Sequence, residues 1–133
     1  MMTDQHPNVA TYIRLMQAFE AGDMQTASQC ASADVVYHVP GKTRYAGDVV
    51  GLNAFKELLD TIRTASAGTG KHTPLHILAD DRAVMVYSRV TAERQGKHMD
   101  MEVAYLFRFN EEGKVTEGRT IPVDLYAFDE FWR

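Results

Sequence analysis

The segment Val35-Val36-Tyr37-His38-Val39-Pro40-Gly41 (residues 35–41) is the most informative stretch of this sequence. Its β-branched and aromatic residues predict a short buried strand, and the Pro-Gly pair predicts that the strand ends there. A side chain at the end of such a strand can point into a pocket. The imidazole of His38 is therefore the first candidate for chemistry.

Helical patterns lie on both sides of this strand. Apolar residues at helical spacing predict one helix over residues 7–22, and Asp23 can cap a second, short helix over residues 24–30. Residues 41–51 are rich in turn formers and predict a loop. A third helix with one apolar face follows this loop and ends near residues 67–70.

Beyond residue 70 the apolar spacing changes from helical to alternating, and turn signals divide the rest of the chain into four consecutive antiparallel strands. The predicted strands cover residues 71–79, 82–94, 97–110 and 114–122, and a last short helix covers residues 125–131. Helices followed by such a meander indicate an α+β fold in which a bent sheet wraps around helices. A cone of this kind leaves a mostly apolar cavity at its wide end, which is the usual place for a ligand.

The size and charge of the chain exclude several classes of protein. A chain of 133 residues fits a single domain over residues 1–133, and 14 basic against 18 acidic side chains leave a net charge of −4 without a dense basic cluster. Nucleic acid is therefore not an expected partner. Cys30 is the only cysteine, so no internal disulfide can form and a cytoplasmic location is the simplest expectation. No run of eighteen apolar residues occurs, so no membrane partner is expected.

The order of these elements resembles that of the nuclear transport factor 2-like (NTF2-like) superfamily, in its SnoaL-like polyketide cyclase and ketosteroid isomerase-like branch. The resemblance covers nearly the whole chain and rests on residues 36–41 followed by residues 45–47, on residues 106–115 and on residues 124–132. It implies a cone-shaped α+β barrel with a strongly bent, mainly antiparallel sheet around N-terminal helices, the fold also called cystatin-like. The two long middle strands offer an outer face for pairing, so we expect a homodimer.

Functional positions of ketosteroid isomerases can be compared with this sequence one by one. By this resemblance, His38 occupies the place of their proton-shuttling aspartate, and Tyr105 occupies the place of the protonated aspartate in their oxyanion hole. Their oxyanion-hole tyrosine aligns with Leu15, while Tyr12 lies about one turn earlier. The comparison therefore favours acid/base chemistry but argues against ketosteroid isomerisation itself.

Each catalytic candidate also has a structural interpretation. His38 is either a general base and acid or a space-filling residue that donates a hydrogen bond to a loop carbonyl. Tyr105 lies on the aromatic face of its predicted strand and either donates to a developing oxyanion or only lines a wall. Asp124 is either a second proton-transfer group or the N-cap of the last helix, and Arg119 could pair with such a carboxylate.

A further set of residues could line the cavity and bind substrate, although for most of them packing in the core is the alternative. The set consists of Tyr12, Met16, Phe19, Tyr45, Phe55, Phe107, Arg119 and Trp132. For Tyr45 the alternative is an anchor for its loop.

Two other groupings invite a functional reading and fail on geometry. Asp100 and Glu102 share a strand face with Arg108, which favours a solvated charged surface over a carboxylate pair. His72 and His76 share a face of a regular strand but lie about 13 Å apart at strand rise, too far to bind one ion together. No metal and no cofactor is therefore expected.

The leading hypothesis is a cofactor-independent acid/base enzyme of the isomerase, cyclase or dehydratase type. Its substrate would be a small, largely apolar molecule that bears a carbonyl group, bound in an internal cavity. The first alternative is a non-catalytic protein that uses the same cavity for binding. The second is a structural dimer module.

Overall fold

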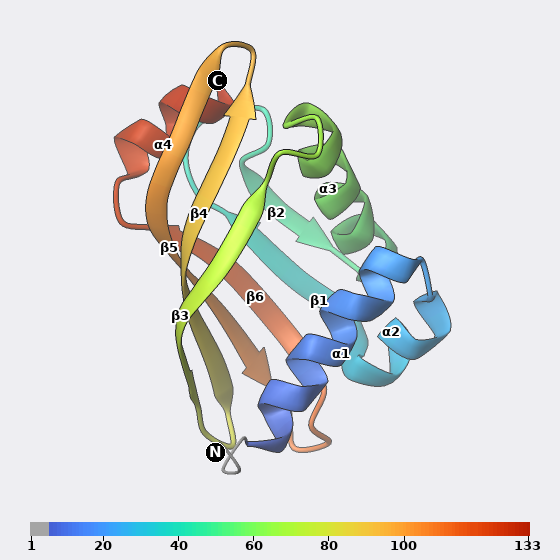
Figure 1. Cartoon of the computed structure of the whole chain (residues 1–133). Helices are drawn as coiled ribbons and strands as arrows, with labels where there is room; N and C mark the ends of the chain where they lie inside the picture. The colour runs from blue at the N-terminus through green and yellow to red at the C-terminus, as the bar shows by residue number, and fades with distance from the viewer. Residues whose placement is uncertain (1–5) are drawn as a thin grey trace.

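The structure is a computed structural model that describes residues 6–133, which form four helices and a six-stranded sheet (Figure 1). In chain order the elements are α1 (Pro7–Ala21), α2 (Met24–Cys30), β1 (Ala31–Val39), β2 (Gly47–Val50), α3 (Leu52–Ala65), β3 (Lys71–Ala79), β4 (Ala83–Arg94), β5 (Lys97–Phe109), β6 (Val115–Pro122) and α4 (Leu125–Trp132).

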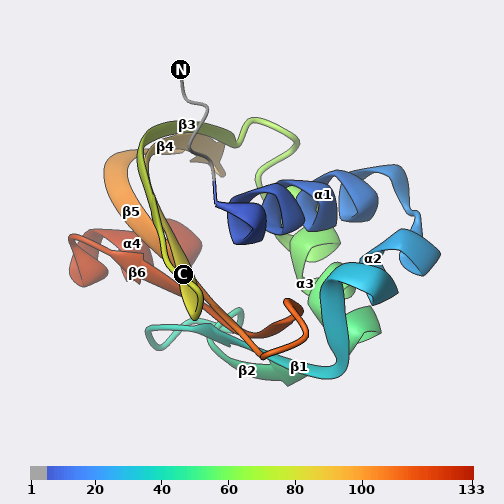
Figure 2. The same ribbon diagram turned by 90° about the horizontal axis from the view of Figure 1, so that it is seen from below.

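The strands form one curled sheet in the order β2-β1-β6-β5-β4-β3. Neighbouring strands are antiparallel except β1 and β6, which run parallel. Seen from below, the sheet describes an arc with α1 and α3 on its concave side (Figure 2). This arrangement confirms the predicted α+β plan of a bent sheet around helices.

Local signals explain why the helices begin and end where they do. The chain enters α1 through Pro7, and α1 ends at Gly22, whose left-handed backbone (φ 72°) turns its N–H back to the carbonyls of the last turn. Asp23 caps α2 by accepting a hydrogen bond from the N–H of Thr26. The predicted helical hairpin is therefore confirmed.

The predicted loop over residues 41–51 differs from the structure, because part of it is a strand. Residues Gly47–Val50 form β2, which pairs with β1 through four residue pairs from Val39↔Gly47 to Val36↔Val50. The strand is too short to show a period of its own in the sequence, and only its pairing with β1 defines it. The partner strand also begins earlier than predicted, at Ala31.

Aromatic rings fill the space between the concave face of the sheet and the helices. Phe55 of α3 is 1% exposed and stacks on Tyr37 of β1 with ring centroids 4.7 Å apart. Phe19 of α1 packs edge to face with Phe55, with ring centroids 5.0 Å apart. These contacts tie α1 and α3 to the middle of the sheet. Phe19 and Phe55, which were candidates for substrate binding, therefore lie in the packed core.

The Tyr37 and Phe107 rings lie directly over Gly118 of β6. A Cβ atom at Gly118 would be 2.8 Å from the Tyr37 ring and 2.9 Å from the Phe107 ring, closer than side chains can approach. Only glycine therefore lets both rings rest on the sheet. Gly118 sets the depth of the concave face.

The helices are short relative to a bilayer. The longest helix in residues 6–133 is α1, with 15 residues, and no helix in this part of the chain is both long and apolar enough to cross a membrane.

Replacement of Phe55 by alanine tests the importance of the aromatic core. We expect Phe55→Ala to lower the free energy of unfolding by about 3–5 kcal/mol, because it removes a fully buried ring and leaves a cavity. Urea unfolding followed by circular dichroism measures the loss. The matched control is Tyr126→Ala, which removes a ring that is 91% exposed and should change stability by less than about 0.5 kcal/mol. Equal effects of the two variants would contradict the packing described above.

Candidate functional site

The alternation of side chains along β1 decides which residues reach the concave face. Val35, Tyr37 and Val39 are buried toward the helices, so His38 points to the opposite, convex face. The expectation that His38 points into the cavity is wrong. The apolar residues on either side of it must face the core, and strand geometry then turns the imidazole outward.

A cluster of uncharged polar groups occupies the concave face in the middle of the sheet. The Tyr37 hydroxyl lies 2.5 Å from Oγ1 of Thr120, and the Tyr105 hydroxyl lies 3.0 Å from Nε2 of His72. Tyr12 of α1 approaches from the helix side and packs against Phe107, with ring centroids 4.9 Å apart. We call Tyr12, Tyr37, His72, Tyr105 and Thr120 the inner cluster.

Desolvation shifts the pKa of the titratable groups in this cluster. Desolvation is the main cause that raises the pKa of Tyr37 and Tyr105 far above the ordinary value of 10.0, and it also raises the pKa of Tyr12. These hydroxyls keep their protons and can donate hydrogen bonds. Desolvation lowers the pKa of His72 below 6.5, which favours a neutral imidazole able to accept a proton, although β3 leaves this residue exposed at the edge of the sheet.

A bulge in the edge strand β3 brings His72 to this cluster. The register of β3 on β4 shifts between Pro74 and His76, so His72 lies opposite Val90 on the concave face while His76 lies opposite Tyr87 on the convex face. The two histidines therefore do not share a face as the regular strand predicted. Proline lacks the N–H that a regular ladder needs, and an edge strand tolerates such a break.

The register also explains how His72 reaches Tyr105 across β4. Tyr105 pairs with Val86 and His72 pairs with Val90, so the line between them crosses Ser88 on the same face. Ser88 is 1% exposed, and its small side chain leaves room for the two larger ones. Sequence reasoning had considered His72 only as a metal ligand and therefore missed this pair.

Half-buried apolar side chains lie on elements that carry or face the inner cluster. They come from α1, α3 and β5 and pack against the core while keeping part of their surface exposed: Ile13, Met16, Leu59, Ile62 and Met101. Met16 thus stays a candidate wall residue, whereas Phe107 is 3% exposed and belongs to the core. A ligand that contacts these residues would gain apolar contact next to the Tyr105 hydroxyl.

Two predicted binding residues, Tyr45 and Trp132, lie together away from the inner cluster. Their rings meet edge to face with centroids 5.5 Å apart, which anchors the loop that follows β1 to helix α4. The guanidinium of buried Arg94 lies 5.7 Å from the Tyr45 ring and donates to the carbonyls of Phe131 and Arg133. Tyr45 also borders an open hollow of about 560 Å³ against the second half of α3.

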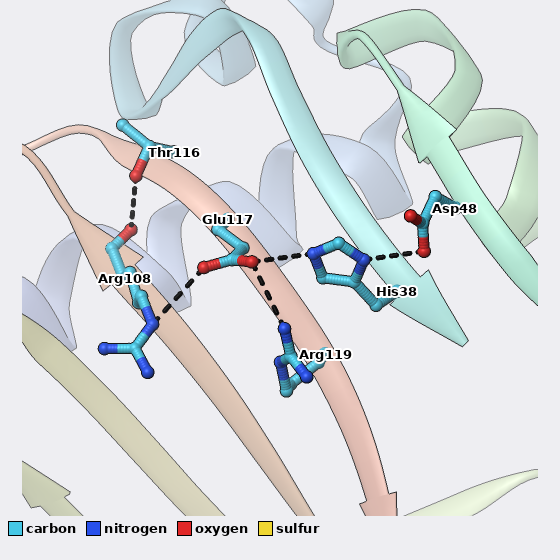
Figure 3. A network of polar contacts seen from close by, with 6 residues as sticks. All are labelled: His38, Asp48, Arg108, Thr116, Glu117 and Arg119. Carbon is cyan, nitrogen blue, oxygen red and sulfur yellow. Dashed lines mark hydrogen bonds and ion pairs between the residues drawn. The ribbon is translucent and has the colours of Figure 1, made fainter. Parts of the chain in front are cut away.

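Charged residues gather around His38 on the convex face (Figure 3). His38 Nδ1 lies 2.6 Å from Oδ1 of Asp48, and Nε2 lies 2.7 Å from Oε2 of Glu117. Glu117 also meets Arg119 and Arg108, each at 3.3 Å. Arg119, a candidate for substrate binding, therefore lies on the face opposite Tyr105.

The remaining charged pairs of the sheet confirm the predicted solvated outer surface. Asp100 accepts two hydrogen bonds from Arg89, at 2.9 and 2.6 Å, and Glu102 accepts one from the Tyr87 hydroxyl at 2.5 Å. Each of these carboxylates has its own partner on a neighbouring strand. They do not form a carboxylate pair for catalysis.

Asp124 caps the last helix, which is the second of the two roles predicted for it. Its Oδ1 accepts a hydrogen bond of 3.0 Å from the N–H of Ala127 at the start of α4. The residue is exposed and has no contact with the inner cluster among the hydrogen bonds of residues 6–133.

A pair of variants separates the capping role of Asp124 from a catalytic one. We expect Asp124→Ala to destabilise the protein by about 0.5–2 kcal/mol, because the N–H of Ala127 loses its acceptor. Asp124→Ser should restore most of this loss, since a serine hydroxyl can also cap a helix. Thermal unfolding measures both. Equal destabilisation by the two variants would show that the carboxylate has another role.

The fold and the sequence both match known proteins. The SnoaL-like domain family matches residues 12–118, and a search of curated proteins found no match. Bal32a from a soil-derived mobile gene cassette is 39% identical, with a TM-score of 0.82 over 95% of this chain and 96% of that one. TerC, co-crystallised with polyporic acid, is 22% identical with a TM-score of 0.75, and the match covers 95% of this chain and 98% of TerC. IdmH from Streptomyces antibioticus, a proposed polyketide cyclase, is 18% identical with a TM-score of 0.65, and the match covers 89% of this chain and 93% of IdmH.

The last two similarities show the fold alone, whereas the family match extends over most of the chain. A Xanthomonas campestris protein with a cystatin-like fold (23% identical, TM-score 0.79) and an NTF2-like protein from Burkholderia pseudomallei (14% identical, TM-score 0.78) confirm the architecture that the sequence predicted. The chain belongs to the SnoaL-like family.

Proposed function

We propose that this protein is an acid/base enzyme that acts on a small, largely apolar molecule with a carbonyl group. The observation that carries the proposal is the 3.0 Å contact between the Tyr105 hydroxyl and Nε2 of His72 on the concave face. One group can donate a hydrogen bond to an oxygen, and the other can take a proton from a neighbouring carbon. Isomerisation, cyclisation and dehydration all use these two roles.

The resting contact between the two side chains suggests how a substrate engages them. When the Tyr105 hydroxyl donates to Nε2, the lone pair of the imidazole is occupied. A substrate carbonyl that accepts the Tyr105 proton as a hydrogen bond instead frees Nε2 to act as a base. Nε2 then takes a proton from the carbon next to the carbonyl, and Tyr105 stabilises the enolate oxygen until the proton returns to carbon.

This proposal places the base at His72 and not at His38, which was the first candidate. His38 lies on the convex face and both of its nitrogens face carboxylates, so it has no free lone pair for a substrate. Asp124 caps α4 and is not part of the mechanism. Tyr105 keeps its predicted role as oxyanion donor, and Tyr12 and Met16 keep theirs as wall residues.

The structural neighbours support this class of substrate. TerC was crystallised with polyporic acid and IdmH is a proposed polyketide cyclase, so related folds are linked to oxygenated, carbonyl-bearing molecules. The inner cluster contains no Asp, Glu, Lys or Arg, and half-buried apolar residues lie on elements that carry or face it. An uncharged ligand with an apolar body suits such a surface.

Exchange of the acidic carbon-bound protons of 2-tetralone in heavy water tests the chemistry directly. The compound is small, apolar and aromatic, and NMR follows the loss of the protons next to its carbonyl. We expect the protein to accelerate the exchange, and Tyr105→Phe and His72→Gln each to reduce the acceleration by about 100-fold or more. Tyr126→Phe and His38→Gln are the matched controls and should leave it unchanged. Acceleration that survives in both Tyr105→Phe and His72→Gln would refute the assignment.

Binding without turnover is the second candidate function. It is favoured by the absence of an ionised side chain in the inner cluster, since such a surface can hold a neutral molecule without reacting with it. In that case 2-tetralone would shift the NMR signals of Tyr105 and raise the melting temperature, while the exchange would stay at the solvent rate.

We further propose that the convex face of the sheet forms a homodimer. Leu78, Met85 and Leu106 lie side by side across β3, β4 and β5, and Tyr87, Ala104 and Ile121 form a parallel row. Positively charged arginines and negatively charged carboxylates both border these rows. Two copies related by a two-fold axis can therefore place opposite charges against each other.

A charge placed in the middle of these rows tests the dimer. We expect Leu106→Glu to convert a dimer into a monomer, because two copies of the new carboxylate would be desolvated together. Sedimentation velocity measures the change. Ala10→Glu, on the exposed side of α1, is the control and should leave the dimer intact. A wild-type protein that sediments as a monomer would contradict this proposal without affecting the proposed chemistry.

A further inference from the structure

The contacts of His38 require a particular protonation state. Its two ring nitrogens lie 2.6 and 2.7 Å from oxygens of two different carboxylates, Asp48 and Glu117. A neutral imidazole has only one N–H, so one carboxylate would then face a nitrogen lone pair. With both carboxylates ionised, the two hydrogen bonds exist together only when the ring is the doubly protonated imidazolium.

The groups that face His38 come from three strands. Asp48 approaches from β2, Glu117 and Arg119 approach from β6, and Arg108 of β5 acts through Glu117 (Figure 3). The hydrogen bond that His38 donates to Asp48 is the largest cause that raises the pKa of His38 above 6.5. Glu117 adds to this effect, whereas desolvation and Arg119 oppose it. The pKa of Glu117 is lowered, chiefly by its hydrogen bond with His38.

These contacts connect an edge strand to the middle of the sheet. β2 is the last strand of the sheet on its side and pairs only with β1. His38 lies on β1, between β2 and β6. It is opposite Asp48 in the pairing of β1 with β2 and opposite Arg119 in the pairing of β1 with β6. The imidazolium therefore joins β2 to β6 across β1 through side chains alone.

The joined strands hold the loop of residues 40–46, which borders the hollow against α3. The pair Val39↔Gly47 closes this loop, and the His38–Asp48 contact lies one residue pair away. At its other side the loop rests on α4, where Tyr45 packs against Trp132 and Lys42 N–H donates to Asp129. Only a few contacts therefore separate His38 from Tyr45.

We propose that His38 is a proton-dependent latch that ties β2 to β6 and holds the loop of residues 40–46 against α4. With the ring doubly protonated, both carboxylates are bound and the loop is closed on Trp132. When the ring loses one proton, one carboxylate is released and the pairing of β2 weakens next to the loop. The Tyr45 side of the hollow against α3 then opens.

The direction of the pH effect follows from the two shifted groups. The raised pKa of His38 gives stability that is complete below about pH 6.5 and is lost as pH rises through the folded-state value. The lowered pKa of Glu117 gives stability that is complete above about pH 4.5 and is lost as pH falls through its folded-state value. The latch therefore contributes most between about pH 4.5 and pH 6.5.

Tryptophan fluorescence reports the latch, because Trp132 is the only tryptophan of the chain and contacts Tyr45. We expect the fluorescence of the wild type to change between about pH 5 and pH 9 with a midpoint above 6.5. His38→Gln should abolish this transition. Asp48→Asn should shift the midpoint to lower pH, because it removes the largest cause of the raised pKa. His76→Gln, on the edge strand of the same face, is the control and should leave the transition unchanged.

Nitrogen-15 NMR of the wild-type histidines gives a second measurement that depends on no variant. Below the fluorescence midpoint both ring nitrogens of His38 should carry a proton, and the ring should lose one proton at the same midpoint. A single protonated nitrogen throughout, or a fluorescence transition that survives in His38→Gln, would overturn the proposal. Neither outcome depends on whether the inner cluster is catalytic.

Discussion

The close approach of two aromatic rings to Gly118 is the constraint on which the rest of the structure depends. Because β6 has no side chain at this position, the rings of Tyr37 and Phe107 can both approach its backbone closely. Phe55 can then stack on Tyr37, which brings α3 down onto the sheet, and the Tyr37 hydroxyl reaches Thr120. The depth of the concave face, the position of the helices and the geometry of the inner cluster thus follow from one missing methyl group.

Most of the fold could be predicted from the sequence, because its boundaries are marked by local chemistry. The end of α1 at Gly22, the cap at Asp23 and the turns between the last strands depend on residues that act within a few positions of one another. β2 could not be predicted in this way. Its four residues carry no period of their own and are a strand only because β1 offers them a partner.

The candidate site was less predictable, because it depends on which face each strand presents. The alternation of Val35, Tyr37 and Val39 is visible in the sequence and turns His38 outward, but the strand end before Pro40 and the resemblance to ketosteroid isomerases both favoured a position in the pocket. The bulge after Pro74 was not visible, since a shift of register belongs to the pairing of two strands. Without that bulge His72 and His76 would share a face.

The two histidines show how surroundings decide what one side chain can do. His72 lies on the exposed edge strand beside the half-buried Tyr105 ring, and desolvation is the cause that lowers its pKa. His38 lies between two carboxylates at a solvated surface, so hydrogen bonds to the charged form dominate and its pKa rises. At neutral pH these opposite shifts favour an imidazole able to accept a proton on the concave face and an imidazolium that holds carboxylates on the convex face. One sheet therefore separates a candidate proton acceptor from a charged cluster by no more than the thickness of its backbone.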